Sequence, residues 1–185
     1  MRLFFGISLP DPIRQAVSAR ASACQSEIPG RYVSEENYHI TLAFLGDVPE
    51  ERISDASGVL SSCIRNTPAP LLTLGETSFF GRAQNAILIT RVLSIPSLDP
   101  LHHALIHGLQ AASLPFDAGP FSPHITLARH ACIEDAPLAA SETLSFVPDR
   151  AHVYLSARNK QNVLCYTPIA SIPFAEFSGL SGKLF

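Results

Sequence analysis

The pentapeptide His-Ile-Thr-Leu-Ala occurs twice in this chain, at residues 39–43 and again at residues 124–128. The copies are 85 residues apart (124 − 39 = 85), which is close to half of the 185-residue length. An identical pentapeptide repeats by chance far less often than a single His-x-Thr, so the pattern indicates an internally repeated architecture. We therefore expect two similar structural units, each with one copy in an equivalent place.

Alternation along a β-strand decides which side chains of each copy share a face. Side chains two residues apart point to the same face of a strand. His39 and Thr41 therefore share one face, and His124 and Thr126 do the same in the second copy. The Ile and Leu of each copy point the other way and fill a core. If the two units pair about an approximate two-fold axis, both His-Thr pairs line one cleft.

The rest of the chain alternates between strand-like and helix-like segments. Expected strands cover residues 2–9, 38–45, 71–80, 86–92 and 124–129, and a closing hairpin pairs 151–157 with 163–171. Expected helices cover 12–26, 49–65 and 97–112, with Asp11 and Ser97 as N-caps, and a short one covers 134–140. Because a helix–loop–strand unit recurs in both halves, we predict an α+β fold in which residues 1–185 form a single bilobal domain. Each of two pseudo-symmetric lobes is then a small, mainly antiparallel sheet with outer helices, and a central cleft separates them.

Composition limits the classes of function. With 46% hydrophobic and 16% charged residues the chain is globular, and no apolar run approaches the roughly 20 residues of a membrane helix. The four cysteines are scattered without a C-x-x-C pair, which is typical of reduced thiols in a cytoplasmic protein. The net charge is −3. A protein that grips a long nucleic acid carries a basic face, so any nucleic acid partner should be an end or a short stretch.

Two facing histidines suit the opening of a cyclic phosphodiester. That reaction needs a base to deprotonate the attacking water and an acid to protonate the leaving oxygen. Because histidine titrates near pH 6.5, one imidazole can be neutral while its partner is charged. The hydroxyls of Thr41 and Thr126 can donate hydrogen bonds to the non-bridging oxygens, and such bonds strengthen as charge builds in the transition state.

Blocks around both copies extend the pattern to most of the chain. They are Arg-Leu-Phe-Phe-Gly-Ile at 2–7 with Leu-Pro at 9–10, Arg-Tyr-Val at 31–33, Asn-Tyr-His-Ile-Thr-Leu at 37–42 with Phe-Leu-Gly at 44–46, and Pro-His-Ile-Thr-Leu-Ala-Arg at 123–129. At these residues the chain resembles the 2H phosphoesterase superfamily. Within it, the chain is most similar to bacterial and archaeal RNA 2′,3′-cyclic phosphodiesterases, which have long been labelled 2′-5′ RNA ligases. Members often have Trp where Tyr32 stands and Leu where Tyr38 stands.

The resemblance implies a two-lobed fold with a V-shaped cleft, no metal ion and no cofactor, and release of a 2′-phosphate end. It also implies that His124 activates water and that His39 protonates the departing 3′ oxygen. Thr41 and Thr126 would hold the phosphate, and Arg129 would add positive charge beside it. The near symmetry of the two copies does not by itself distinguish acid from base.

Two other functions remain open from the sequence. One is hydrolysis of small cyclic nucleotides such as ADP-ribose 1″,2″-cyclic phosphate, and the other is a module that binds RNA ends or nucleotides without turnover. Ligation would be the same chemistry in reverse, with a 5′ hydroxyl replacing water. The expected partner is thus an RNA 3′ end or a cyclic nucleotide. The protein is expected to be a monomer that does not bind a membrane.

Other residues are weaker candidates. His103 and His107 share a helix face with the spacing of zinc ligands, but Ala104 stands where the metalloprotease motif has Glu, so solvated histidines are favoured there and at His102. Phe79 and Phe80 could stack a base, although an apolar strand favours a core role for them. Positive charges that could surround the cleft come from Arg82, Arg91, Arg150, Arg158 and Lys160.

Overall fold

Two antiparallel sheets form the framework of the protein. The structure is a computed structural model, and it describes residues 1–93, 95–133, 138 and 142–175. The first sheet has the strand order β3-β1-β8-β9, and the second has the order β2-β6-β5-β4-β7. The strands of the first sheet are β1 (Arg2–Ser8), β3 (His39–Asp47), β8 (Arg150–Arg158) and β9 (Leu164–Pro173). Those of the second are β2 (Arg31–Tyr32), β4 (Leu72–Arg82), β5 (Asn85–Val92), β6 (His124–Ala131) and β7 (Leu144–Phe146).

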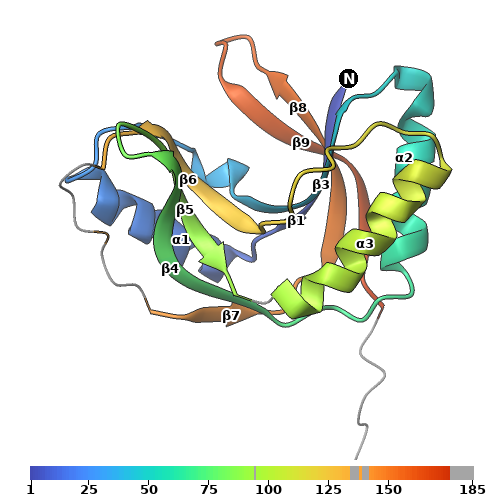
Figure 1. The fold of residues 1–185 in the computed structure, drawn as a ribbon, viewed down its shortest axis with the longest axis horizontal. Coiled ribbons are helices and arrows are strands. Elements are labelled where there is room, and N and C mark those ends of the chain that lie inside the picture. Colours follow the sequence, from blue (N-terminus) through green and yellow to red (C-terminus); the bar gives the residue numbers. More distant parts are fainter. Residues whose placement is uncertain (94, 134–137, 139–141, 176–185) are drawn as a thin grey trace, which may run out of the picture.

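Helices flank both sheets. α2 (Ile53–Ile64) and α3 (Ile95–Ala111) pack together and contact strands of the first sheet, whereas α1 (Asp11–Gln25) lies beside the second (Figure 1). Arg20 ties α1 to β4, because its Nη1 donates a hydrogen bond of 2.8 Å to the Gly75 carbonyl. Short 3₁₀ turns, η1 (Glu35–Asn37) and η2 (Glu50–Arg52), precede β3 and α2. The α+β prediction with two sheets and outer helices is confirmed. Among the described helices, none has the length and apolar character needed to span a bilayer.

The two sheets do not correspond to the two halves of the chain. The first sheet combines strands from residues 2–47 with the hairpin from residues 150–173, because β8 pairs with β1. The second sheet combines β2 with strands from residues 72–146. The repeated pentapeptide therefore marks equivalent strands, β3 in one sheet and β6 in the other, and not two equivalent halves.

Several local predictions differ from the structure. Asp11 is not an N-cap: the cap position of α1 is Pro10, and Asp11 is the first helical residue, 2.9 Å from the Arg14 guanidinium. Ser97 lies inside α3, which already begins at Ile95. The short strands β2 and β7 were not predicted. The expected helix at 134–140 lies outside the described residues except for Leu138.

The aliphatic residues of both pentapeptides form part of the core, as predicted. Ile40, Leu42, Ile125 and Leu127 are each at most 1% exposed. Burying such a side chain completely contributes about 1.5–3 kcal/mol relative to leaving it in water. The apolar face of each copy thus anchors its strand and leaves the opposite face free for polar side chains.

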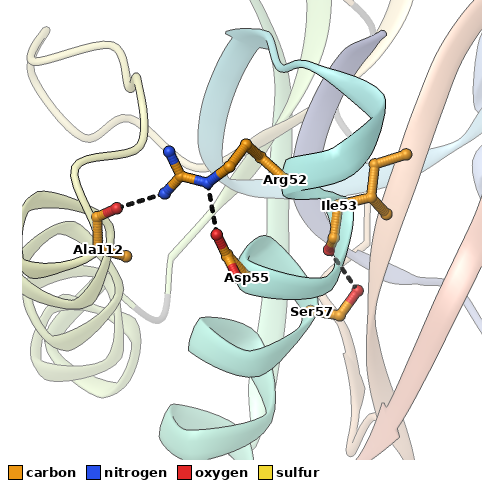
Figure 2. Close-up of polar contacts among 5 residues, drawn as sticks. All are labelled: Arg52, Ile53, Asp55, Ser57 and Ala112. Carbon is orange, nitrogen blue, oxygen red and sulfur yellow. Dashed lines mark hydrogen bonds and ion pairs between the residues drawn. The ribbon is translucent and has the colours of Figure 1, made fainter.

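The junction of α2 with the end of α3 is held by polar contacts (Figure 2). Arg52 Nη2 donates a hydrogen bond of 2.7 Å to the Ala112 carbonyl, and Arg52 Nε pairs with the Asp55 carboxylate. The Ser57 hydroxyl donates to the Ile53 carbonyl at 3.0 Å in the first turn of α2. These contacts fix the point where the chain leaves α3 and turns towards β6.

Two helical glycines should respond in opposite directions to alanine. A Cβ at Gly108 would lie 2.7 Å from Cγ1 of Val59, a stiff β-branched side chain on α2, whereas a Cβ at the exposed Gly58 meets nothing within 4 Å. We expect Gly108→Ala to lower the free energy of unfolding by about 1–3 kcal/mol and Gly58→Ala to raise it by about 0.5–1 kcal/mol. Urea unfolding of both variants measures this. Stabilisation by both would mean that α2 and α3 are not tightly packed at Gly108.

Candidate active site

His39 and His124 occupy equivalent places and are held in the same way. His39 Nδ1 lies 2.7 Å from the carbonyl oxygen of Asn37, and His124 Nδ1 lies 2.7 Å from that of Ser122. A carbonyl only accepts, so in both rings Nδ1 carries the proton. The neutral form of each imidazole therefore leaves Nε2 without a proton, ready to accept one. Each copy of the pentapeptide thus presents a histidine with the same tautomer.

A bulge at the fourth residue of each pentapeptide changes which side chains face the cleft. Gly6 pairs with Thr41 while Phe5 pairs with Ala43, so Leu42 is the extra residue in β3. Ile89 pairs with Thr126 while Leu88 pairs with Ala128, so Leu127 is the extra residue in β6. A bulge re-aims the residues that follow it. As a consequence, Phe44 and Arg129 both line the cavity described next, where strict alternation would have turned them away.

A cavity of about 440 Å³ lies between the two sheets. Its walls come from β1, β3, β8 and β9 of the first sheet and from Arg129 of β6 in the second. His39 and Thr41 line it directly. His124 and Thr126 lie farther along β6, outside the wall of this cavity, and both are partly exposed. His124 is nevertheless close enough to His39 for its charge to act on that ring.

Aromatic rings surround the first histidine. The His39 ring centroid lies 4.7 Å from that of Phe4, 4.8 Å from that of Tyr166 and 5.9 Å from that of Tyr154. His124 has one such neighbour, Phe80, at 5.0 Å in an edge-on arrangement. Phe80 is half-buried and lies against His124, contrary to the core role favoured by its sequence context. The two histidines have matching tautomers but unequal surroundings.

These surroundings lower the pKa of both imidazoles. Burial lowers the pKa of His39 to about 4; the hydrogen bond to Asn37 opposes this shift, while His124 and Arg129 add to it. The pKa of His124 is also lowered, first by burial and then by Arg129, against the hydrogen bond to Ser122. Near neutral pH both rings are therefore neutral. A bound phosphate anion would counter Arg129 and favour protonation of the nearer ring.

The low pKa of His39 makes folding stability depend on pH. An unfolded histidine binds its proton near pH 6.5, whereas folded His39 resists protonation until about pH 4. Its contribution to stability is therefore present above pH 6.5 and is lost as the pH falls through about 4. We expect His39→Gln to lose less unfolding free energy than the wild type between pH 7.5 and 4.5 in urea titrations. An equal loss in both proteins would contradict the low pKa.

Asn37 is a site residue that sequence reasoning missed. Its side-chain Nδ2 donates a hydrogen bond of 3.0 Å to the Leu164 carbonyl, and its Oδ1 accepts one of 3.0 Å from the Tyr166 amide. Its main-chain carbonyl holds His39. Asn37 therefore links the start of β3, which carries His39, to β9, which carries Tyr166, an aromatic neighbour of His39. In the sequence it stood only as the first residue of the block at 37–42 that carries the family resemblance, with no role assigned to it.

The weaker candidates are dispersed. His102 Nδ1 donates a hydrogen bond of 2.8 Å to the Leu42 carbonyl, and its ring stacks on Phe121 with the ring centroids 4.1 Å apart. His103 is exposed, and its Nδ1 donates a hydrogen bond to the main-chain carbonyl of Asp99. Within the described parts of the chain, no three His, Cys, Asp or Glu side chains gather as a metal site would require. Of the positive candidates, Arg158 lines the cavity, while Arg91 and Arg150 pair with Glu76 and Asp149.

Comparison with known proteins gives one consistent result. Residues 9–160 match the family model described as the 2′-5′ RNA ligase superfamily. An RNA 2′,3′-cyclic phosphodiesterase of Escherichia coli K12 is 40% identical over 133 residues, which are 70% of this chain and 72% of that protein. One from Geobacillus stearothermophilus is 31% identical over 180 residues and 92% of this chain, and the match spans 56% of that longer protein.

Solved structures agree with the sequence relatives. The crystal structure of E. coli LigT complexed with 3′-AMP superposes with a TM-score of 0.78 at 28% identity, covering 94% of this chain and 97% of that one. A Thermus thermophilus protein, TT0787, superposes with a TM-score of 0.76 at 23% identity, covering 96% of this chain and all of that one, and shows the shared fold.

Proposed function

The chain belongs to the 2′-5′ RNA ligase superfamily, and from that membership we propose that it hydrolyses RNA 2′,3′-cyclic phosphate ends to 2′-phosphomonoesters. The observation that carries this proposal is the matched pair of histidines. Both have Nδ1 bound to a main-chain carbonyl, so both leave Nε2 for proton transfer. The relatives named RNA 2′,3′-cyclic phosphodiesterase support the choice of substrate.

In the proposed mechanism the two histidines divide the proton transfers. His124 Nε2 takes a proton from water as the oxygen attacks phosphorus, and the 3′ oxygen leaves with a proton from His39 Nε2. Thr41 and Thr126 donate hydrogen bonds to the non-bridging oxygens, and Arg129 stabilises the added negative charge. His39 must be protonated to act as the acid, so the substrate phosphate has to raise its low pKa.

Ligation follows from the same arrangement. If a 5′ hydroxyl occupies the place of water, His124 takes its proton and His39 again protonates the departing 3′ oxygen, so the two RNA ends are joined by a 2′-5′ phosphodiester. In the reverse reaction the 3′ hydroxyl attacks and the 5′ oxygen leaves, so His39 becomes the base and His124 the acid. All the side chains in this proposal come from one chain, which supports a monomer as the active unit. The four cysteines are free thiols, which suits a reducing compartment such as the cytoplasm.

Incubation with an RNA that carries a 2′,3′-cyclic phosphate end, in EDTA, tests the proposal. We expect the end to become a 2′-phosphate at a rate that the chelator does not change, because protein side chains supply both proton transfers. Rapid turnover of a small cyclic nucleotide without turnover of the RNA end would favour the alternative substrate class. Binding without turnover of either would favour a non-catalytic module, and loss of activity in EDTA would contradict the mechanism.

A further inference from the structure

A second cavity adjoins the one that contains His39. It measures about 270 Å³ and lies between the segment that starts at β2 and the β8–β9 hairpin. Both cavities are lined by Arg129, Arg158, Leu164 and Tyr166, so they share a boundary. The mechanism uses the first cavity and the neighbouring part of β6 that carries His124 and Thr126. The second is therefore a part of the same cleft that the hydrolysis of a lone cyclic phosphate does not require.

The second cavity is positively charged in a chain whose net charge is −3. Arg31, Arg129 and Arg158 line it, and no Asp or Glu is found among the described residues that line either cavity. Arg31 and Arg129 are direct cross-strand partners in β2 and β6, so their side chains leave the same face of the sheet. Like charges placed directly opposite each other destabilise a sheet. An anion bound between them would remove this cost.

The remaining walls suit a nucleoside. The apolar and aromatic residues that line the second cavity are Val33, Leu164, Tyr32 and Tyr166. The Tyr32 hydroxyl donates a hydrogen bond of 3.0 Å to the Ile28 carbonyl, which fixes the ring, and burial raises its pKa to about 12. Apolar walls with aromatic faces bind bases through stacking, which tolerates any sequence.

The hairpin that closes the second cavity is held in shape by its own polar contacts. Asn159 Oδ1 accepts hydrogen bonds from the main-chain amides of Gln161 and Val163, at 3.0 and 2.9 Å. Arg158 Nη1 donates a hydrogen bond of 2.6 Å to the Asn162 carbonyl. The guanidinium of Arg158 is therefore held at the boundary of the two cavities, where the phosphate between two nucleotides would lie.

We propose that the second cavity binds the nucleotide that precedes the cyclic phosphate end, with its phosphodiester held by Arg31 and Arg158 and its base on the apolar wall beside Tyr32. This inference rests on the proposed function, since it assumes that the cyclic phosphate binds beside His39. It identifies the substrate as an oligonucleotide end, because a mononucleotide leaves the second cavity unused.

Three substrates with the same terminal nucleoside test this proposal. They are the 2′,3′-cyclic mononucleotide, its 5′-phosphorylated form, and the dinucleotide with the same cyclic end. We expect kcat/KM to rise in that order, by about 10- to 100-fold in total, because a stacked base or a paired phosphate each contributes on this scale. Equal values for the mononucleotide and the dinucleotide would overturn the proposal.

A variant and its control locate the effect. Arg31→Gln should reduce the ratio of the dinucleotide to the mononucleotide value towards one, whereas Arg65→Gln, at an exposed position after α2, should leave the ratio unchanged. Arg31→Gln should also raise the Tm, because it removes the opposed charges. A merely structural role of Arg31 would instead lower the Tm and affect both substrates equally, which would overturn the proposal.

Product binding separates this proposal from the proposed function. The 2′-phosphorylated dinucleotide should bind about 10- to 100-fold more tightly than the 2′-phosphorylated mononucleotide in calorimetric titrations. If this preference is found but no cyclic end is hydrolysed, nucleotide binding in the second cavity is supported and the proposed hydrolase function is contradicted. If cyclic ends are hydrolysed but neither binding nor turnover shows the preference, the second cavity does not bind a nucleotide.

Discussion

Replacing His39 or His124 with alanine is expected to lower kcat on an RNA 2′,3′-cyclic phosphate end by about 10²–10⁴-fold, the usual share of one general acid or base. Each variant loses the only Nε2 that its pentapeptide presents, while its strand stays anchored by buried Ile and Leu side chains. Single-turnover rates with a labelled cyclic end measure the loss. Because the two transfers belong to one reaction, the double variant should lose less than the product of the two single effects.

Exposed His103 on α3 provides the matched control, and His103→Ala should keep the wild-type rate. Circular dichroism and the Tm of each variant show whether the fold is retained. Full activity in both His39→Ala and His124→Ala would mean that the two histidines are not the catalytic pair.

The second large effect is a difference between two substrates, and it shows which histidine is the acid and which is the base. A 3′ ribose oxygen is a poor leaving group and must be protonated as it departs, whereas nitrophenolate is stable as an anion. On a nitrophenyl phosphodiester that the cavity accepts, His39→Ala should therefore lose less than about tenfold, while it loses about 10²–10⁴-fold on the cyclic phosphate. His124→Ala should remain equally impaired on both, because water must still lose a proton.

The ratio of the two losses for each variant is the informative quantity. It cancels changes in stability or expression, since both substrates meet the same protein. If the better leaving group rescues His124→Ala instead, the roles are reversed and the substrate lies in the opposite orientation. That outcome would agree with the lowered pKa of His39, which keeps this ring neutral and able to accept a proton in the unliganded site.

The strands that carry both histidines could be predicted because their signals are local. Alternation within five residues gives the buried Ile and Leu and the partly exposed His and Thr of each copy, and β3 and β6 have this pattern in the structure. Alternation could not predict that Arg129 lines the cavity, because its orientation depends on the bulge at Leu127. Only the resemblance to a known family indicated that residue.

The features that were missed depend on distant partners. β2 is two residues long and exists because Arg31 and Tyr32 pair with Arg129 and Ala128 of β6. Asn37 acquires its role from contacts with a strand that is more than 120 residues away in the sequence. The mixed origin of the two sheets has the same cause, since the closing hairpin pairs with β1 and not with a neighbour in sequence.

This mixed origin has a consequence for how activity is gained and lost. The first sheet cannot be completed until the hairpin of β8 and β9 has joined β1, so a fragment containing only the first histidine would leave β1 without its partner β8. We expect His39 and His124 to be assembled in one cooperative event. During synthesis, no partly folded chain should then have one working histidine without the other. Proteolytic removal of the closing hairpin should abolish both proton transfers together.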